Sequence, residues 1–69
     1  MVEQLTLKQK HDLVNQYKNK TLNSVYGPVL VTGLDVDGDV EMKEFEETFF
    51  LSIDDFIVLL VEDNGVVIK

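Results

Sequence analysis

Acidic side chains gather in one stretch of this 69-residue sequence, where their spacing is close enough for chemistry. Seven carboxylates fall within thirteen positions, mostly at every second or third residue: Asp35, Asp37, Asp39, Glu41, Glu44, Glu46 and Glu47. Closely spaced carboxylates can bind a hard cation such as calcium, or they can imitate a row of phosphates. These two kinds of site need different surroundings, so the neighbouring residues decide between them.

Calcium is the first chemistry to consider. Four of the carboxylates have the spacing of positions 1, 3, 5 and 12 of an EF-hand loop: Asp35, Asp37, Asp39 and Glu46. Position 6 of such a loop turns sharply and is nearly always glycine, whereas this chain has the β-branched Val40 there. The preceding segment, which contains Gly27-Pro28, is not the helix that an EF-hand requires. We therefore predict no metal site and no cofactor.

Phosphate mimicry fits the same carboxylates if they lie on a β-hairpin. Alternate residues of a strand are about 6.6–7 Å apart, which is close to the phosphate spacing along one DNA strand. A hairpin that carried these acids would present a row of negative charges to a basic groove on a partner protein. A solvated hairpin with no partner explains the pattern equally well, because surface charge also keeps small proteins soluble.

The charge is divided unevenly between the two halves of the chain. Residues 1–34 carry four lysines against two acids, whereas residues 35–69 carry eleven acids against two lysines, a net charge of −9. An acidic surface cannot displace counterions from phosphates, so we do not expect direct binding to nucleic acid. Complementary charge favours a basic protein partner and speeds its encounter with the acidic surface.

Residues that could support catalysis are sparse. His11 is the only histidine, and Ser24 and Ser52 have no base near them in the sequence. There are no cysteines, and no stretch approaches the roughly 18 apolar residues of a membrane span. We therefore expect a non-enzymatic, cytoplasmic protein with a single domain over residues 1–69. A chain this short has a small core, so a homodimer would add stability.

The first half of the sequence predicts a helix followed by a strand. Residues 7–20 have helical composition, and Thr6 with Gln9 has the spacing of a capping box that begins a helix. Its apolar face includes Leu7, Val14 and Tyr17, a narrow stripe that is typical of a helix lying over a sheet. The segment 23–34 is rich in strand-forming residues, and Gly27-Pro28 makes that strand start, bend or lie at an edge.

The second half predicts another strand and leaves one segment open. Asp37-Gly38 is typical of a tight turn, after which Val40–Phe50 predicts a strand with a bulge near residues 44–47. Such a bulge would turn Phe45, Phe49 or Phe50 inward. Ser52 resembles a helix N-cap before an apolar run at helical spacing, so we predict a helix over residues 52–62. The same apolar run also suits a buried strand.

Together these elements predict an α+β fold. The expected order is an N-terminal helix, an antiparallel hairpin, a second short helix that ends at Gly65, and a short final strand over residues 66–69. The alternative is a helix followed by four strands in a small β-barrel, which applies if residues 53–62 form a strand.

The run from Leu51 to Leu59 resembles the helix of the small phage-encoded inhibitors of uracil-DNA glycosylase. The resemblance covers residues 31–60, includes the Asp37-Gly38 turn and Glu44-Phe45, and requires two gaps. It implies an acidic, dimeric protein that mimics DNA in the binding groove of the enzyme. Phosphate surrogates would then be Glu41, Glu44, Glu46 and Glu47, with Phe45 or Phe49 as the pocket contact. The N-terminal helix has no counterpart in that family.

The same stretch also resembles, more locally, a strand of the bacterial Sm-like RNA chaperones, which begin with a helix too. The basic residues that those proteins use for RNA are absent here, and so is their closing strand. This second resemblance therefore supports only the barrel alternative.

The sequence leads to two hypotheses about function. The first is an acidic module that binds a basic groove on a protein, such as a DNA-mimicking inhibitor of uracil-DNA glycosylase. Its expected partner-binding residues are Asp35, Asp37, Asp39, Glu41, Glu44, Phe45, Glu46, Glu47 and Phe49. The second hypothesis is a structural or assembly protein that associates with itself through Phe49, Phe50 and the apolar run 56–61.

Overall fold

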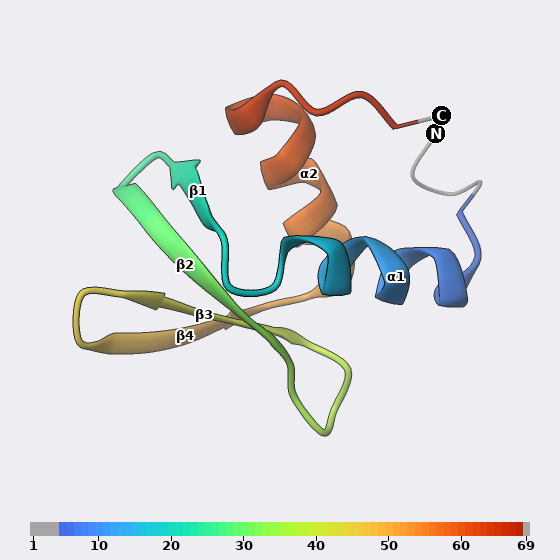
Figure 1. Ribbon diagram of the computed structural model, residues 1–69, viewed down its shortest axis with the longest axis horizontal. Coiled ribbons are helices and arrows are strands. Elements are labelled where there is room, and N and C mark those ends of the chain that lie inside the picture. The colour runs from blue at the N-terminus through green and yellow to red at the C-terminus, as the bar shows by residue number, and fades with distance from the viewer. Residues whose placement is uncertain (1–4, 69) are drawn as a thin grey trace.

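The fold combines an antiparallel sheet with two helices, which confirms the α+β class. A computed structural model describes residues 5–68 (Figure 1). Its elements in chain order are α1 (Leu7–Tyr17), β1 (Thr21–Ser24), β2 (Gly27–Leu34), β3 (Val40–Glu44), β4 (Glu47–Leu51) and α2 (Ile53–Asn64). Neither helix is long and apolar enough, within these described residues, to cross a membrane.

The four strands form a meander in which each strand pairs with the next one along the chain. The order across the sheet is β1-β2-β3-β4, and every pairing is antiparallel. β1 and β4 are therefore the two edges of an open sheet, and they do not close the barrel that we considered as an alternative. The register shifts between Val31 and Gly33 of β2, where a bulge bends the strand.

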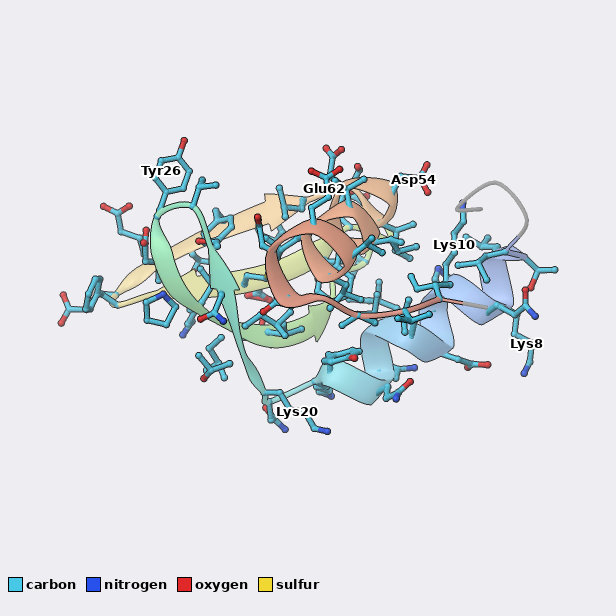
Figure 2. All side chains as sticks on the ribbon, turned by 90° about the horizontal axis from the view of Figure 1, so that it is seen from above. Lys8, Lys10, Lys20, Tyr26, Asp54 and Glu62 are labelled. Carbon is cyan, nitrogen blue, oxygen red and sulfur yellow. The ribbon has the colours of Figure 1, made fainter. Side chains whose placement is uncertain are left out.

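Only one face of the sheet is covered. Alternate residues of each strand point toward α1 and α2, which both lie on that face, and Figure 2 shows α2 crossing over the strands. The buried residues come from both helices and from the first three strands: Val14, Leu22, Val29, Val31, Val40, Met42, Phe56 and Leu60. The opposite face of the sheet, which carries Leu30, Lys43 and Phe50, has no helix over it.

The first helix begins as predicted and ends three residues early. Thr6 accepts a hydrogen bond from the Gln9 amide at 3.1 Å, and the Gln9 side chain accepts one from the Thr6 amide at 2.8 Å. Asn19 ends the helical region in the left-handed conformation, with φ +67°. Val14 is fully buried, but Leu7 is 65% exposed, so its predicted place on the packed face is wrong.

Residues 53–62, for which the sequence allowed either a helix or a strand, belong to the helix α2. The Ser52 hydroxyl accepts a hydrogen bond from the Asp55 amide at 3.2 Å, which confirms the predicted N-cap of α2. Gly65 follows the helix with φ +65°, a left-handed conformation in which glycine has no Cβ to clash. The apolar residues at helical spacing can therefore face the sheet together, and Phe56, Ile57 and Leu60 are all fully buried.

Three predicted strands differ from the structure: two are divided by turns and one is absent. The segment 40–50 was expected to be one bulged strand, but Phe45 and Glu46 form a two-residue turn between β3 and β4. The segment 23–34 is likewise divided by a turn at Val25-Tyr26, so that β2 begins at Gly27. The strand predicted at the C-terminus is also wrong, because residues 65–68 belong to no strand, and residue 69 lies outside the described range.

One side chain joins the end of α2 to the edge of the sheet. The Asn64 carboxamide accepts a hydrogen bond from the Asn23 amide at 2.8 Å and donates one to the Asn23 carbonyl at 3.0 Å. Asn64 also donates to the Leu59 carbonyl at 3.1 Å. These bonds occupy the outward-facing backbone groups of Asn23, at the exposed edge of β1.

An ion pair joins the two helices at the other end of α2. The Lys10 ammonium lies 2.8 Å from Asp54, and the side chain of Lys10 is only 17% exposed. The aliphatic part of Lys10 is therefore covered while its charge reaches a first-turn carboxylate of α2. α2 is held at its start by this pair and the Ser52 cap, and at its end by Asn64.

We predict that Asn64→Ala lowers the free energy of unfolding by about 1–3 kcal/mol, because it leaves the β1 edge and the Leu59 carbonyl without their partners. Urea denaturation followed by circular dichroism measures this change. Asn15→Ala, at an exposed site on α1, is the matched control and should change stability by less than about 0.5 kcal/mol. Equal effects of the two substitutions would contradict a bridging role for Asn64.

Candidate functional site

The turn between β3 and β4 carries a bulky residue in an unfavourable backbone conformation. Phe45 is the first residue of this two-residue turn, its φ is +56°, and its side chain is 93% exposed. A positive φ at this position favours glycine, and a residue with a Cβ costs roughly 1–2 kcal/mol there. Because the Phe45 ring is exposed, it makes little packing contact within the chain. No burial of the ring therefore offsets the cost of its backbone conformation.

Carboxylates frame Phe45 on both sides. Glu44 and Glu47 are directly opposite each other as the last residue pair of β3 and β4, and Glu46 lies in the turn between them. Like charges at directly opposed positions of an antiparallel pair repel each other and destabilise the hairpin. Among the described residues, the ion pairs are Lys8–Asp12 and Lys10–Asp54, and neither one neutralises this turn.

A second exposed turn lies at the same end of the sheet. Turns of a meander alternate between its two ends, so the β1–β2 turn and the β3–β4 turn project in the same general direction (Figure 1). Val25 and Tyr26 form the β1–β2 turn and are 79% and 84% exposed. Tyr26 points outward from its turn in Figure 2. We call this part of the molecule the hairpin end and define it as Val25, Tyr26 and residues 44–47.

The acids at 35–39 lie away from the hairpin end. They occupy the β2–β3 turn, which is at the opposite end of β3. The Asp35 carboxylate accepts hydrogen bonds from the amides of Asp37 and Asp39, at 2.9 and 3.0 Å. This carboxylate therefore organises its own turn rather than facing a ligand. The continuous acidic hairpin expected from the sequence is wrong, because β3 separates the acids into two groups.

The remaining predicted site residues lie on different faces of the sheet. Glu41 faces the uncovered side, opposite Phe50 in the register, and its side chain is partly exposed. Phe49 points to the covered side and packs against the core, so it is less accessible than the 53% exposed Phe50. The structure thus brings together Glu44, Phe45, Glu46 and Glu47, but not Glu41 and Phe49 with them.

Sequence reasoning did not include Val25 and Tyr26 in the site. The available signal was Gly27-Pro28 directly after them, because a strand that starts at this dipeptide requires a turn just before it. Two bulky side chains at the tip of a turn are exposed by geometry alone, whatever their hydrophobicity.

The hairpin end offers apolar and charged contacts for recognition of a partner. The hollow beside the β3–β4 turn is lined only by residues 44–47, so a single turn rather than several elements surrounds it. Within residues 5–68, no three histidine or carboxylate side chains gather closely enough to hold a metal ion. Exposed aromatic rings and unpaired carboxylates suit a partner that offers apolar contact and positive charge.

Comparisons with known proteins give no further assignment. No protein-family model matches this chain, and neither the curated proteins nor the solved structures contain a significant match. Any functional conclusion therefore depends on the geometry described above.

We predict that Phe45→Gly raises the free energy of unfolding by about 0.5–1 kcal/mol, because glycine adopts the left-handed conformation without a Cβ clash. Phe45→Ala is the control, since it also removes the ring but keeps the Cβ, and we expect no gain in stability from it. Thermal and urea unfolding of the two variants provide the measurement. A loss of stability in Phe45→Gly would show that the ring stabilises the fold.

Proposed function

We propose that this chain is an acidic protein-binding module that places the hairpin end of its sheet in a basic groove of a partner protein. A groove that normally holds nucleic acid has the required positive charge. The specific partner that we propose, uracil-DNA glycosylase, comes from the resemblance of residues 31–60 to the small phage-encoded inhibitors of that enzyme. Binding there would inhibit the enzyme by occupying its DNA site. Such a partner is intracellular, and we place the module in the cytoplasm.

The observation that carries this proposal is the strained, exposed Phe45 between three glutamates. Backbone strain of this kind is concentrated at binding and switch sites, where it holds a side chain ready for contact. In the free protein, the turn combines this strain with repulsion between Glu44 and Glu47. A basic groove would relieve the repulsion between Glu44 and Glu47, and burial of the Phe45 ring in it would offset the backbone strain.

The charge balance of the whole chain supports the same kind of partner. The formal net charge is −7, and the second half of the sequence, which supplies β3, β4 and α2, carries most of the negative charge. A field of one sign attracts a basic partner from a distance and raises the rate of association. The exposed rings of Tyr26 and Phe45 would then supply apolar contact area once the surfaces meet.

The self-association hypothesis receives less support from the structure. Phe56, Ile57 and Leu60, which belong to the apolar run 56–61, are buried in the core. The exposed residues of that run, Val58 and Val61, are on α2, which covers one face of the sheet, whereas Phe50 lies on the other face. These side chains therefore do not form one continuous apolar patch. Sedimentation at several concentrations distinguishes a monomeric module from a self-associating one.

We predict that the double variant Glu46→Gln/Glu47→Gln weakens binding to uracil-DNA glycosylase by about tenfold or more, because it removes two interfacial charges. Glu62→Gln/Asp63→Asn is the matched control, since it removes the same net charge from exposed positions on α2. Inhibition of uracil excision at low and high salt measures both variants. The control variant should still inhibit uracil excision nearly as well as the unmodified chain, whereas Phe45→Ala should lose most of this inhibition.

A pull-down from lysate with the same variants extends this test beyond one enzyme. A specific basic partner should be retained at low salt by the control variant but not by the hairpin variant. If both variants retain the same proteins, the charge acts without regard to position and the hairpin end is not the binding site. If the chain neither inhibits the glycosylase nor retains any protein at low salt, the proposed function fails.

A further inference from the structure

The two edge strands of the sheet, β1 and β4, differ in how far other elements cover them. Asn64 covers the β1 edge by bonding to both backbone groups of Asn23. At the other edge, β4 has no element beyond it in Figure 1, and α2 packs mainly against β1. Edge strands in proteins are usually short, covered, or protected by lysine or proline. β4 contains neither residue type, since its sequence is Glu47–Leu51 with two phenylalanines.

The turn geometry shows which backbone groups of β4 face outward. Residues that flank a two-residue turn bond to each other, so the next residue along each strand directs its N–H and C=O away from its partner. β1 obeys this rule, because Ser24 flanks its turn and Asn23 is the residue whose groups reach Asn64. Glu47 flanks the β3–β4 turn, so the outward-facing residues of β4 are Thr48 and Phe50.

We infer that β4 is a docking edge that takes an extended segment of a partner protein as a fifth strand of the sheet. This inference rests on the proposed function and specifies how the partner binds. The backbone groups of Thr48 and Phe50 would pair with the added strand, in the mode by which extended peptides augment a sheet edge. The exposed Phe50 ring, on the uncovered face, would contact a side chain of that strand directly opposite.

Charge complementarity identifies the partner segment. Glu46 and Glu47 lie at the start of β4, and Asp54 and Asp55 follow its end. Lys10 pairs with Asp54, and no ion pair among residues 5–68 involves Asp55. An added strand would therefore pass between two acidic positions, so a segment with β-branched or aromatic residues in the middle and Lys or Arg at both ends fits this edge.

The same charges disfavour a second copy of this chain. Antiparallel pairing of two β4 strands about a two-fold axis would lay the Glu46–Glu47 end of each copy against the Asp54–Asp55 end of the other. Acidic residues of one copy would then lie near acidic residues of the other at both ends of the two paired β4 strands. Repulsion between these like charges disfavours the dimer. The basic segment of a different protein is free of this conflict.

The test uses the full chain and a synthetic peptide with capped ends, Lys-Lys-Val-Thr-Val-Thr-Val-Lys-Lys. We expect the peptide to bind at low salt and to shift the backbone amide resonances of Thr48 and Phe50 most strongly. Thr48→Pro should weaken binding at least about tenfold, because proline removes an outward-facing donor without removing a bond to β3. Thr48→Val keeps the amide and is the matched control, so it should bind as the unmodified chain does.

A modified peptide makes the result independent of whether the proline variant folds. The same sequence with N-methyl groups on all five central residues cannot donate to β4 from either of its edges and should bind at least about tenfold more weakly. If the methylated and unmodified peptides bind equally, the edge inference is overturned while the proposed function stands. Absence of peptide binding, or shifts at Thr48 that depend on the concentration of the chain alone, also overturns the inference. The glycosylase and pull-down measurements decide the proposed function separately.

Discussion

Burial of Phe56 and Leu60 against the sheet is the interaction on which the rest of this structure depends. α2 can cover the sheet because its apolar residues recur at helical spacing, and it stays in place because Ser52, Lys10 and Asn64 fix its two ends. Two helices cover one face of a four-stranded sheet, and no further element among residues 5–68 covers the other face. The uncovered face, the β4 edge and the hairpin end are thus consequences of where α2 lies.

Unfavourable features of the fold are concentrated away from this packed region. The left-handed Phe45 and the opposed pair Glu44 and Glu47 meet in the single turn between β3 and β4. A small domain has a narrow margin of stability, so strain and repulsion in one turn are a substantial fraction of the total. Glycine at position 45 would remove the strain at no cost to the core, so the core does not require phenylalanine there.

The parts of the fold that follow from local chemistry could be predicted from the sequence. The capping box at Thr6, the cap at Ser52 and the left-handed Gly65 each depend on one or two side chains, and all three are present. The β3–β4 turn could not be predicted, because its residues lack the glycine or asparagine that marks such turns. The acids of the site were therefore expected along one hairpin, with Glu41–Glu47 on a single long strand, whereas Glu44–Glu47 and Asp35–Asp39 lie in or beside turns at opposite ends of β3.

The hairpin end and the β4 edge are continuous, since β4 begins at Glu47 immediately after the turn that contains Phe45. A partner segment that pairs along β4 would therefore reach the strained turn without any rearrangement of the sheet. Backbone pairing is indifferent to sequence, so it would fix distance and direction, whereas the acids at each end of β4 would select a segment with basic flanks. DNA mimicry alone requires only that the carboxylates lie at phosphate spacing. An added strand also requires a free edge, and β4 supplies that second condition at the place where the charge is highest.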